Sequence, residues 1–285
     1  MEISYRYLRF PGGKGKAVTM SYDDGCRQDI KLSNIISQYG MKCTFNLNSD
    51  KLCSNGLSRE EINTYILSRG HEIAVHGAFH RAPGIHRPIE GIRDVIDCRM
   101  ELEEKFDTII RGMAYPASGI VAMTQHNSYE KIREYLTNLD IAYARTLAGD
   151  NDYFELPSDW YAWMPSAHHS NPEIFSYIDK FLNIDMSVGP IADRFPRLFY
   201  IWGHSYEFDE NCNWELLETI CEKIGNREDI WYATNIEIYN YVEAYNSLIY
   251  SSDSTRMYNP TLYKIWFEIN GEKYVINPGE TLKIA

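Results

Sequence analysis

KAVTMSYDDG (residues 16–25) is an apolar run that ends in two acids and a glycine. The run predicts a buried β-strand over Ala17–Ser21, with the acids at its carboxyl end. A second run of this kind is followed by HGAFH (residues 76–80). Because site residues of β/α barrels gather at the carboxyl ends of the strands, we expect the two segments to lie close together.

These two segments contain the donors of an open metal site. One of the acids Asp23 and Asp24, with His76 and His80, would supply three ligands and leave positions free for water and substrate. The second acid would then be available to take a proton. Taken singly, Asp-Asp-Gly is most often a solvated turn and the histidine spacing is most often incidental. Their joint occurrence after two predicted strands favours the metal site.

Composition limits the partners. The 285 residues are 44% hydrophobic and 24% charged, as in a globular enzyme with one barrel or two ordinary domains. The formal net charge of −12 opposes binding to nucleic acid or to an anionic membrane, because the encounter would be repulsive. We therefore expect a neutral or cationic substrate, no nucleic acid and no membrane.

The amino terminus and the cysteines indicate in which cellular compartment the protein is expected. The first residues lack the basic and apolar regions of a signal peptide, so a cytoplasmic location is expected. The six cysteines show no CxxC spacing, which predicts reduced thiols and argues against zinc knuckles. Cys26 lies beside the acids but has no obvious local partner that would activate it as a nucleophile.

Strand and helix patterns alternate along most of the chain. Apolar, β-branched or aromatic runs predict strands at Ala17–Ser21, Lys42–Leu47, Glu72–Val75, Thr108–Ala114, Ile141–Thr146, Trp160–Met164, Leu198–Trp202 and Ile230–Thr234. Helical patterns lie at residues 30–39, 58–66, 89–105, 128–136, 172–182, 214–224 and 236–245. This alternation predicts an α/β protein whose parallel strands close, or nearly close, into a barrel over residues 1–250.

The last thirty residues have a different pattern. Leu262–Glu268 and Lys273–Ile276 read as strands joined through Asn270-Gly271, which is a strong hairpin signal. We expect residues 255–285 to form a small C-terminal β-hairpin appendage after the barrel.

Three motifs resemble those of the polysaccharide deacetylases, that is carbohydrate esterase family 4 or the NodB-homology family. They are TMSYDDG (residues 19–25), the pair His76 and His80, and WGH (residues 202–204), and the resemblance extends from about Ala17 to Tyr245. The family fold is a distorted β/α barrel of seven or eight strands. The resemblance implies that Asp23 is the catalytic base, that Asp24, His76 and His80 hold a divalent metal, and that His204 is the general acid. Zinc is the first expectation, with cobalt, nickel or manganese as alternatives.

The third family motif, Arg-x-Pro and an aromatic residue, is altered here. If Pro116 is the family proline, Ala114 stands where the arginine belongs, so Arg145 or Arg111 would have to replace it. The side chains expected along the substrate cleft are those of Tyr115, Pro116, Arg145, His168 and Trp202.

The expected function is a metal-dependent hydrolase of carbon–nitrogen bonds other than peptide bonds. It would remove an N-acetyl group, and secondarily an O-acetyl group, from a carbohydrate or a small acylated metabolite. One alternative is a hydrolase of a non-sugar amide, and another is a catalytically impaired carbohydrate-binding protein, which the altered third motif would allow. A non-haem iron oxygenase uses the same donor set but needs neither the second acid nor a late histidine.

Overall fold

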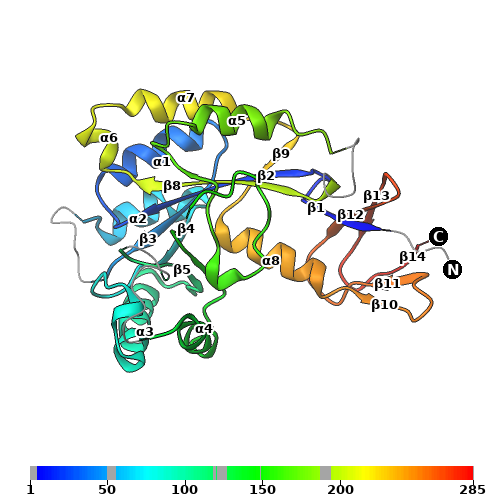
Figure 1. Cartoon of the computed structure of the whole chain (residues 1–285), viewed down its shortest axis with the longest axis horizontal. Coiled ribbons are helices and arrows are strands. Elements are labelled where there is room, and N and C mark those ends of the chain that lie inside the picture. Colours follow the sequence, from blue (N-terminus) through cyan, green and yellow to red (C-terminus); the bar gives the residue numbers. More distant parts are fainter. Residues whose placement is uncertain are drawn as a thin grey trace.

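A curled sheet of parallel strands forms the centre of the molecule, with helices on its outside (Figure 1). The structure is a computed structural model and describes residues 5–49, 56–117, 120, 127–147, 149–186 and 194–284. The strand order is β6-β5-β4-β3-β2-β8-β7, and β9 pairs with the first half of β2. The bounds are β2 Lys16–Asp23, β3 Cys43–Leu47, β4 Glu72–Val75, β5 Gly112–Ala114, β6 Tyr143–Arg145, β7 Ala167–His168, β8 Arg197–His204 and β9 Ile230–Tyr232. The predicted distorted β/α barrel is confirmed.

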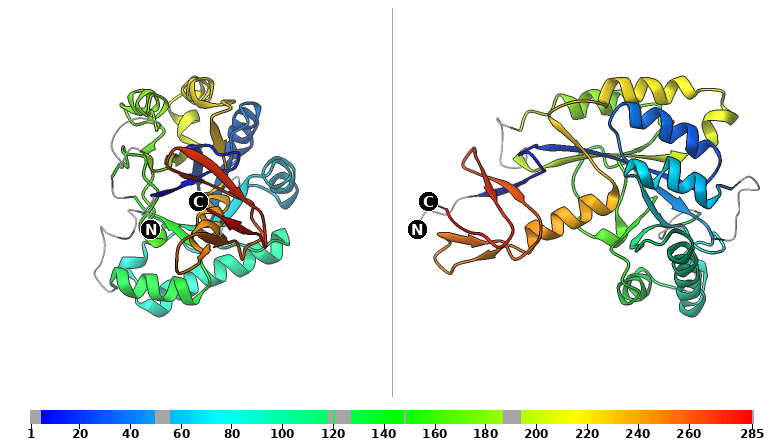
Figure 2. Two further views of the ribbon diagram at one scale, coloured as in Figure 1. Left: turned by 90° about the vertical axis from the view of Figure 1, so that its right-hand side faces the viewer. Right: turned by 180° about the vertical axis from the view of Figure 1, so that it is seen from behind.

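The helices lie on two sides of this sheet. Helices α1, α5 and α7 cover one side, and α3 and α4 lie on the opposite side (Figures 1 and 2). The bounds are α1 Gln28–Gln38, α2 Arg59–Tyr65, α3 Pro88–Phe106, α4 Tyr129–Asn138, α5 Ile174–Leu182, α6 Glu207–Glu210, α7 Trp214–Ile224 and α8 Asn235–Asn246. In the described part of the chain, no helix combines the length and the apolar character needed to cross a membrane.

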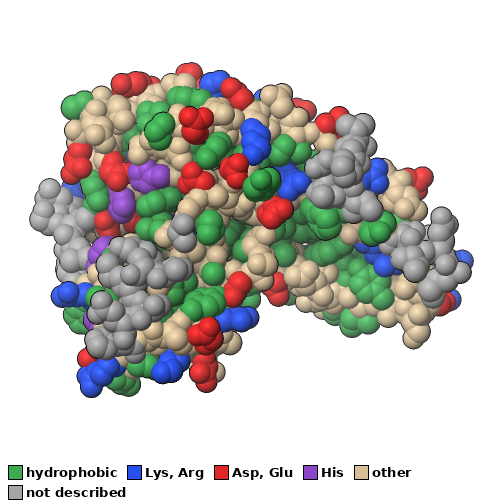
Figure 3. All heavy atoms as spheres, in the orientation of Figure 1, with side chains coloured by type: hydrophobic (Ala, Val, Ile, Leu, Met, Phe, Trp, Pro, Cys, Tyr) green, Lys and Arg blue, Asp and Glu red, His purple; other side chains and the backbone are tan. Residues whose placement is uncertain are grey.

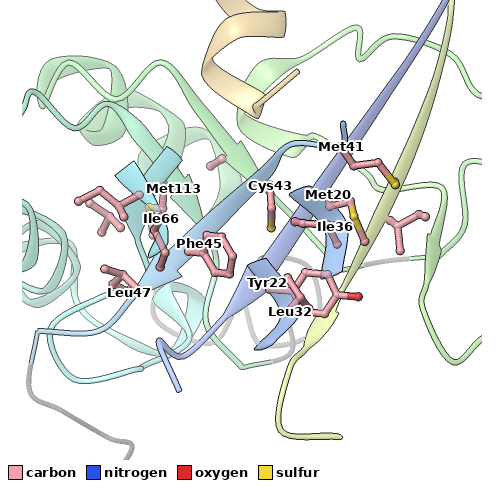
Figure 4. Close-up of a cluster of buried hydrophobic side chains, with 14 of the residues drawn as sticks. Met20, Tyr22, Leu32, Ile36, Met41, Cys43, Phe45, Leu47, Ile66 and Met113 are labelled. Carbon is pink, nitrogen blue, oxygen red and sulfur yellow. The ribbon is translucent and has the colours of Figure 1, made fainter. Parts of the chain in front are cut away.

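The two-residue period of β2 explains why its last residue points into the barrel. Val18, Met20 and Tyr22 belong to the apolar core outside the sheet, where Met20 and Tyr22 lie near Leu32 and Ile36 of α1 (Figure 4). The alternate positions are polar and buried: Thr19, Ser21 and Asp23. Since successive side chains of a strand point to opposite faces, burying the apolar set against the helices directs Asp23 inward.

The interior of the barrel contains a column of hydrogen-bonded polar groups. Asn46 Nδ2 donates to Ser21 Oγ (2.7 Å), and Thr19 Oγ1 donates to Asn235 Oδ1 (2.9 Å). At the opposite end of the barrel from Asp23, Glu72 accepts from the hydroxyls of Thr44 and Tyr143, both at 2.7 Å. Buried polar groups cost free energy unless they are paired, so these bonds make a polar barrel interior tolerable.

The barrel closes through the segment that begins at Trp160. The first residues of this segment do not form a regular strand. We predicted a strand at Trp160–Met164, but Asp159 accepts a hydrogen bond from the Tyr161 backbone N–H (3.0 Å) and a 3₁₀ turn, η4 (Trp160–Ala162), forms there. Trp163 then pairs with β6, its N–H donating to the Ala144 carbonyl (3.1 Å), and β7 pairs with β8. One short segment therefore joins the two sides of the curled sheet.

Two small sheets lie at one end of the molecule (Figure 1). The predicted hairpin is present as β12 (Ile265–Ile269) and β13 (Glu272–Ile276), but its other neighbour is the early strand β1 (Arg6–Arg9). The second sheet contains β10 (Ile249–Tyr250), β11 (Arg256–Tyr258) and β14 (Thr281–Lys283). Residues before Lys16 thus pair with the tail, whereas we had expected them in the barrel. A domain boundary near residue 250 stays a prediction.

The cysteines differ from expectation at one position. Cys26 is in a disulfide bond, whereas Cys43, Cys98, Cys212 and Cys221 are free thiols. Cys53 lies outside the described residues. The prediction that all thiols are reduced is therefore wrong, and the Cys26 sulfur is not available as a nucleophile.

Candidate active site

The predicted site residues meet at the carboxyl ends of the parallel strands. Asp23 ends β2, Asp24 follows it, His76 follows β4, and His204 ends β8. Histidine and acidic side chains gather at this end of the molecule, below α6 (Figure 3). Because β2 and β8 pair in register from Lys16↔Arg197 to Asp23↔His204, Asp23 and His204 are opposite each other on neighbouring strands.

Asp24, His76 and His80 form a compact group of three donors. Asp24 Oδ1 lies 3.6 Å from His76 Nε2 and 3.5 Å from His80 Nε2, and the three donor atoms lie within 4.8 Å of one another. Both Asp24 (φ 78°) and His80 (φ 49°) adopt the left-handed backbone conformation, which is uncommon outside glycine. One carboxylate and two imidazoles suit a borderline divalent ion.

The hydrogen bond of His76 Nδ1 leaves Nε2 as the nitrogen that can bind a metal. His76 Nδ1 lies 2.9 Å from the Ala114 carbonyl, which can only accept, so Nδ1 carries the proton. The Nε2 lone pair is then directed toward Asp24. An imidazole oriented by a backbone carbonyl is the usual arrangement of a histidine ligand.

Asp23 is held by two partners inside the barrel. Its Oδ2 accepts from Arg145 Nη2 at 2.5 Å, and its Oδ1 accepts from Asn46 Nδ2 at 2.8 Å. Burial works against ionisation of Asp23, but the charge of Arg145, with smaller contributions from His76 and His204, lowers its pKa below the usual value. Asp23 is therefore an ionised carboxylate in a buried position.

The geometry distinguishes between the two candidate arginines, Arg145 and Arg111. Arg145 is fully buried and pairs with Asp23, whereas Arg111 pairs with Asp140 at 2.9 Å. Arg145 was also expected along the substrate cleft, but it is buried and pairs with Asp23 instead.

His204 presents its Nε2 to the two acids. This atom lies 4.0 Å from Asp23 Oδ2 and 3.9 Å from Asp24 Oδ2, while His204 Nδ1 lies 3.2 Å from Glu207 Oε1. Burial would lower the pKa of His204, but the hydrogen bond to Glu207 and the charges of Asp23 and Asp24 raise it overall. The position and protonation of His204 suit a proton donor.

Glu207 is a site residue that the sequence reasoning missed. Besides His204, its Oε2 lies 3.1 Å from His168 Nε2 and 3.3 Å from His169 Nε2. These contacts lower the pKa of Glu207 although burial opposes the shift. The only available signal was an acid three residues after a histidine that ends a strand.

A second group of potential metal donors, His168, His204 and Glu207, is better described as a hydrogen-bonded cluster. His168 Nδ1 accepts from the Ser170 backbone N–H (3.2 Å), so the proton of the neutral ring is on Nε2 and is donated to Glu207. The same carboxylate also lies 3.2 Å from His204 Nδ1 and 3.3 Å from His169 Nε2.

The other residues expected along the cleft, Trp202, Tyr115 and Pro116, differ in how far they are buried. Trp202 is half-buried, and its ring packs against the Arg145 guanidinium (4.8 Å) and the His168 ring (4.5 Å). Tyr115 is fully buried and its hydroxyl donates to the Tyr161 carbonyl (2.8 Å), so it is a core residue and cannot stack on a sugar. Pro116 is also buried.

Comparison with known proteins agrees with this fold. Residues 5–139 match the family model described as polysaccharide deacetylase, and this stretch includes Asp23, Asp24, His76 and His80. A polysaccharide-deacetylase-like protein of Mycobacterium smegmatis has a similar structure, with a TM-score of 0.57 and 16% identity over 84% of this chain and 94% of that chain. At this identity the similarity concerns the fold alone.

Two further solved structures are more distant. They are a family 4 carbohydrate esterase from Streptomyces lividans (TM-score 0.49, 10% identity, covering 76% of this chain and 92% of that chain) and the peptidoglycan deacetylase PdaC from Bacillus subtilis (0.48, 13%, 81% and 95%). Scores at this level carry no argument. No curated protein is significantly similar in sequence.

The β/α barrel is of the NodB type, and it carries an Asp-His-His group at the carboxyl ends of its strands. Over residues 5–139 the chain is similar in sequence to the polysaccharide deacetylases.

Proposed function

We propose that the protein is a divalent-metal-dependent hydrolase that removes an N-acetyl group from a carbohydrate. The observation that carries the proposal is the position of a buried carboxylate, Asp23, and a histidine, His204, beside the donor group Asp24, His76 and His80, with His204 Nε2 about equally distant from both acids. A base and an acid at one centre are what amide hydrolysis requires.

The donor set fits a transition metal. Asp24, His76 and His80 would hold the ion through one carboxylate oxygen and two Nε2 atoms, and zinc is the first candidate, with cobalt, nickel and manganese as alternatives. When bound, such an ion would polarise the acetyl carbonyl and make a water molecule more acidic.

The protein's own groups move the protons. Asp23, kept ionised by Arg145 and oriented by Asn46, would accept the proton of the attacking water. His204, whose Nδ1 is fixed on Glu207, would donate the Nε2 proton to the departing amine. An amine is a very poor leaving group without this proton, so the presence of His204 favours amides over activated esters and N-acetyl over O-acetyl substrates.

The alternative of an impaired carbohydrate-binding protein rested on the altered third motif. Arg145 supplies a buried guanidinium to Asp23 from another strand, which supports a catalytic protein despite the altered motif. A non-sugar amide remains the alternative substrate, and O-acetyl groups are the alternative acyl class.

The location stays a prediction. Disulfides persist mainly in oxidising compartments, so the disulfide of Cys26 weighs against the cytoplasmic location expected from the amino terminus.

The proposal is tested by following acetate release from N-acetylglucosamine oligomers, O-acetylated xylan and small non-sugar amides. We expect release from the first substrate class, its loss on chelation, and its recovery with zinc or cobalt. If only the small amides are hydrolysed, the substrate is a metabolite and not a carbohydrate. If oxygen is consumed with an organic co-substrate, the protein is an oxygenase and not a hydrolase.

A further inference from the structure

Asp29 is a buried acid in the first turn of α1 that the reaction described above does not use. Its side chain is completely shielded from solvent, and it lies just beyond the connection between β2 and α1 that carries the metal donor Asp24. Burying a carboxyl group costs free energy unless hydrogen bonds compensate for the lost water. The contacts that Asp29 makes inside the protein must therefore offset this cost.

One oxygen of Asp29 accepts a hydrogen bond from the turn after β8. Ser205 Oγ donates to Asp29 Oδ1 at 2.6 Å, and Ser205 is also fully buried. The other oxygen, Oδ2, has no hydrogen-bond partner among the described residues. Burial raises the pKa of Asp29 to about 8, although the bond from Ser205 opposes the shift. Asp29 is therefore mostly a neutral acid at pH 7, and in this form its Oδ1 still accepts the serine hydroxyl.

This hydrogen bond connects the two segments on which the proposed reaction depends. Ser205 stands in the turn between His204 and Glu207, while Asp29 belongs to the helix that follows Asp24. Because β2 and β8 are neighbours in the sheet, the two segments leave adjacent strand ends. A link directly beyond the strands restricts the separation of the late histidine from the metal donor, which is 3.9 Å between His204 Nε2 and Asp24 Oδ2.

A second hydrogen bond joins the same two parts of the chain at the surface. Gln28, the neighbour of Asp29 in α1, donates from Nε2 to Asp209 Oδ2 of the short helix α6 at 2.8 Å, in contact with solvent. Water can replace an exposed hydrogen bond at little cost, whereas a buried donor or acceptor that loses its partner stays unpaired. The surface bond is therefore a matched comparison for the buried one.

We propose that Asp29 and Ser205 are positioning residues that hold His204 at its working distance from the metal-binding group. Both side chains are fully buried, so neither touches the substrate. The inference rests on the proposed function, because this distance matters only if His204 protonates the departing amine. Misplacing a reacting group by about 1 Å reduces a rate by roughly 100-fold, so one buried bond is enough to control this proton transfer.

The experiment compares Ser205→Ala, Asp29→Leu, Asp29→Asn and, as the surface control, Gln28→Ala. Leucine cannot accept the serine hydroxyl, whereas asparagine keeps the accepting oxygen. For each protein, kcat and KM are measured on an N-acetylglucosamine oligomer and on an aryl acetate, together with metal content and melting temperature. Crystal structures of zinc-loaded wild type and Ser205→Ala give the separation of His204 Nε2 from the Asp24 carboxylate.

We expect Ser205→Ala and Asp29→Leu to lose about 10- to 100-fold in kcat on the amide, with unchanged KM and metal content. The aryl acetate should be affected much less, because its leaving group needs little help from an acid. Asp29→Asn should restore most of the amide activity, and Gln28→Ala should resemble wild type. Ser205→Ala removes only a hydroxyl, so it tests the bond even if Asp29→Leu does not fold.

Three results would overturn the inference. They are an equal loss on the amide and the aryl acetate, an equal loss in Asp29→Asn and Asp29→Leu, and an equal loss in Gln28→Ala and Ser205→Ala. Each would make the buried bond a support of the fold without a specific effect on His204.

The two proposals fail in different ways. An unchanged separation of His204 from Asp24 in Ser205→Ala rejects the positioning role, whatever the reaction is. A separation that grows by more than about 0.5 Å, the tolerance of a catalytic geometry, keeps the positioning role. If no protein, wild type included, then releases acetate, deacetylation alone is rejected.

Discussion

Arg145 and Asp23 form a fully buried ion pair, with Arg145 Nη2 2.5 Å from Asp23 Oδ2, although 122 residues separate them in the chain. Their strands are not neighbours: β3, β4 and β5 lie between β2 and β6 in the sheet. The pair therefore spans the interior of the barrel and exists only because the sheet curls. Arg145 thus places a guanidinium beside Asp23, although the third motif lacks its arginine.

Removing this guanidinium should impair the base. Because Arg145 holds the pKa of Asp23 down, Arg145→Gln should raise that pKa and move the acidic limb of the pH profile of kcat/KM to higher pH. Loss of one partner of a buried pair also costs about 3–5 kcal/mol of stability, so the melting temperature must be measured alongside. Arg111→Gln is the matched control, since that arginine pairs with Asp140 away from the site. An unshifted acidic limb in a folded Arg145→Gln protein would exclude this role for Arg145.

The adjacent acids should separate by role. Asp23→Asn is expected to keep the metal and lose activity by about 10²–10⁴-fold, the weight of a positioned general base. Asp24→Asn and His80→Ala remove a ligand and should lose metal and activity together. Elemental analysis of the purified variants checks this, and equal metal content in wild type and in the His76→Ala/His80→Ala double variant would eliminate the site.

His204 and Glu207 should act as one unit in leaving-group protonation. His204→Ala should impair amide substrates far more than activated aryl acetates, whose leaving groups need little help from an acid. Glu207→Gln weakens the interaction that raises the pKa of His204, so the basic limb of the amide pH profile should move to lower pH. The same loss on amides and aryl acetates would instead assign His204 to binding or to cleft structure.

Glu72 should make the folded protein less stable as the pH rises. Burial raises its pKa to about 7 from 4.5, although hydrogen bonds from Ile236, Thr44 and Tyr143 oppose the shift. The folded state then binds the proton more tightly than the unfolded state, so this contribution to the free energy of unfolding falls between about pH 4.5 and 7, by at most about 1.4 kcal/mol per pH unit. Urea unfolding at pH 5, 6, 7 and 8 should show a flatter dependence for Glu72→Gln than for wild type, with the exposed Glu134→Gln as control. Parallel curves for all three proteins would contradict the prediction.

Local patterns predicted most of the secondary structure. The alternation in β2 places Asp23 on the inner face, and Ser58 with Glu61 forms the predicted capping box at the start of α2. The pattern was misleading at residues 160–164, where aromatic residues suggested a strand. There the Asp159 side chain caps a 3₁₀ turn, and the Trp160 ring packs on Trp163 at 4.9 Å. Nor did any pattern connect β1 to the tail.

Sequence patterns alone predict which chemical groups stand at the ends of the strands: two acids at the end of β2, the two histidines at 76 and 80, and the late His204. These follow from the periods of strands and helices, which are properties of short segments. The contact of Arg145 with Asp23, and the three imidazoles around Glu207, become visible in the folded structure alone. These contacts depend on how far the sheet curls and on how Trp163 bridges its two sides, which is set by packing across the whole barrel rather than by neighbours along the chain.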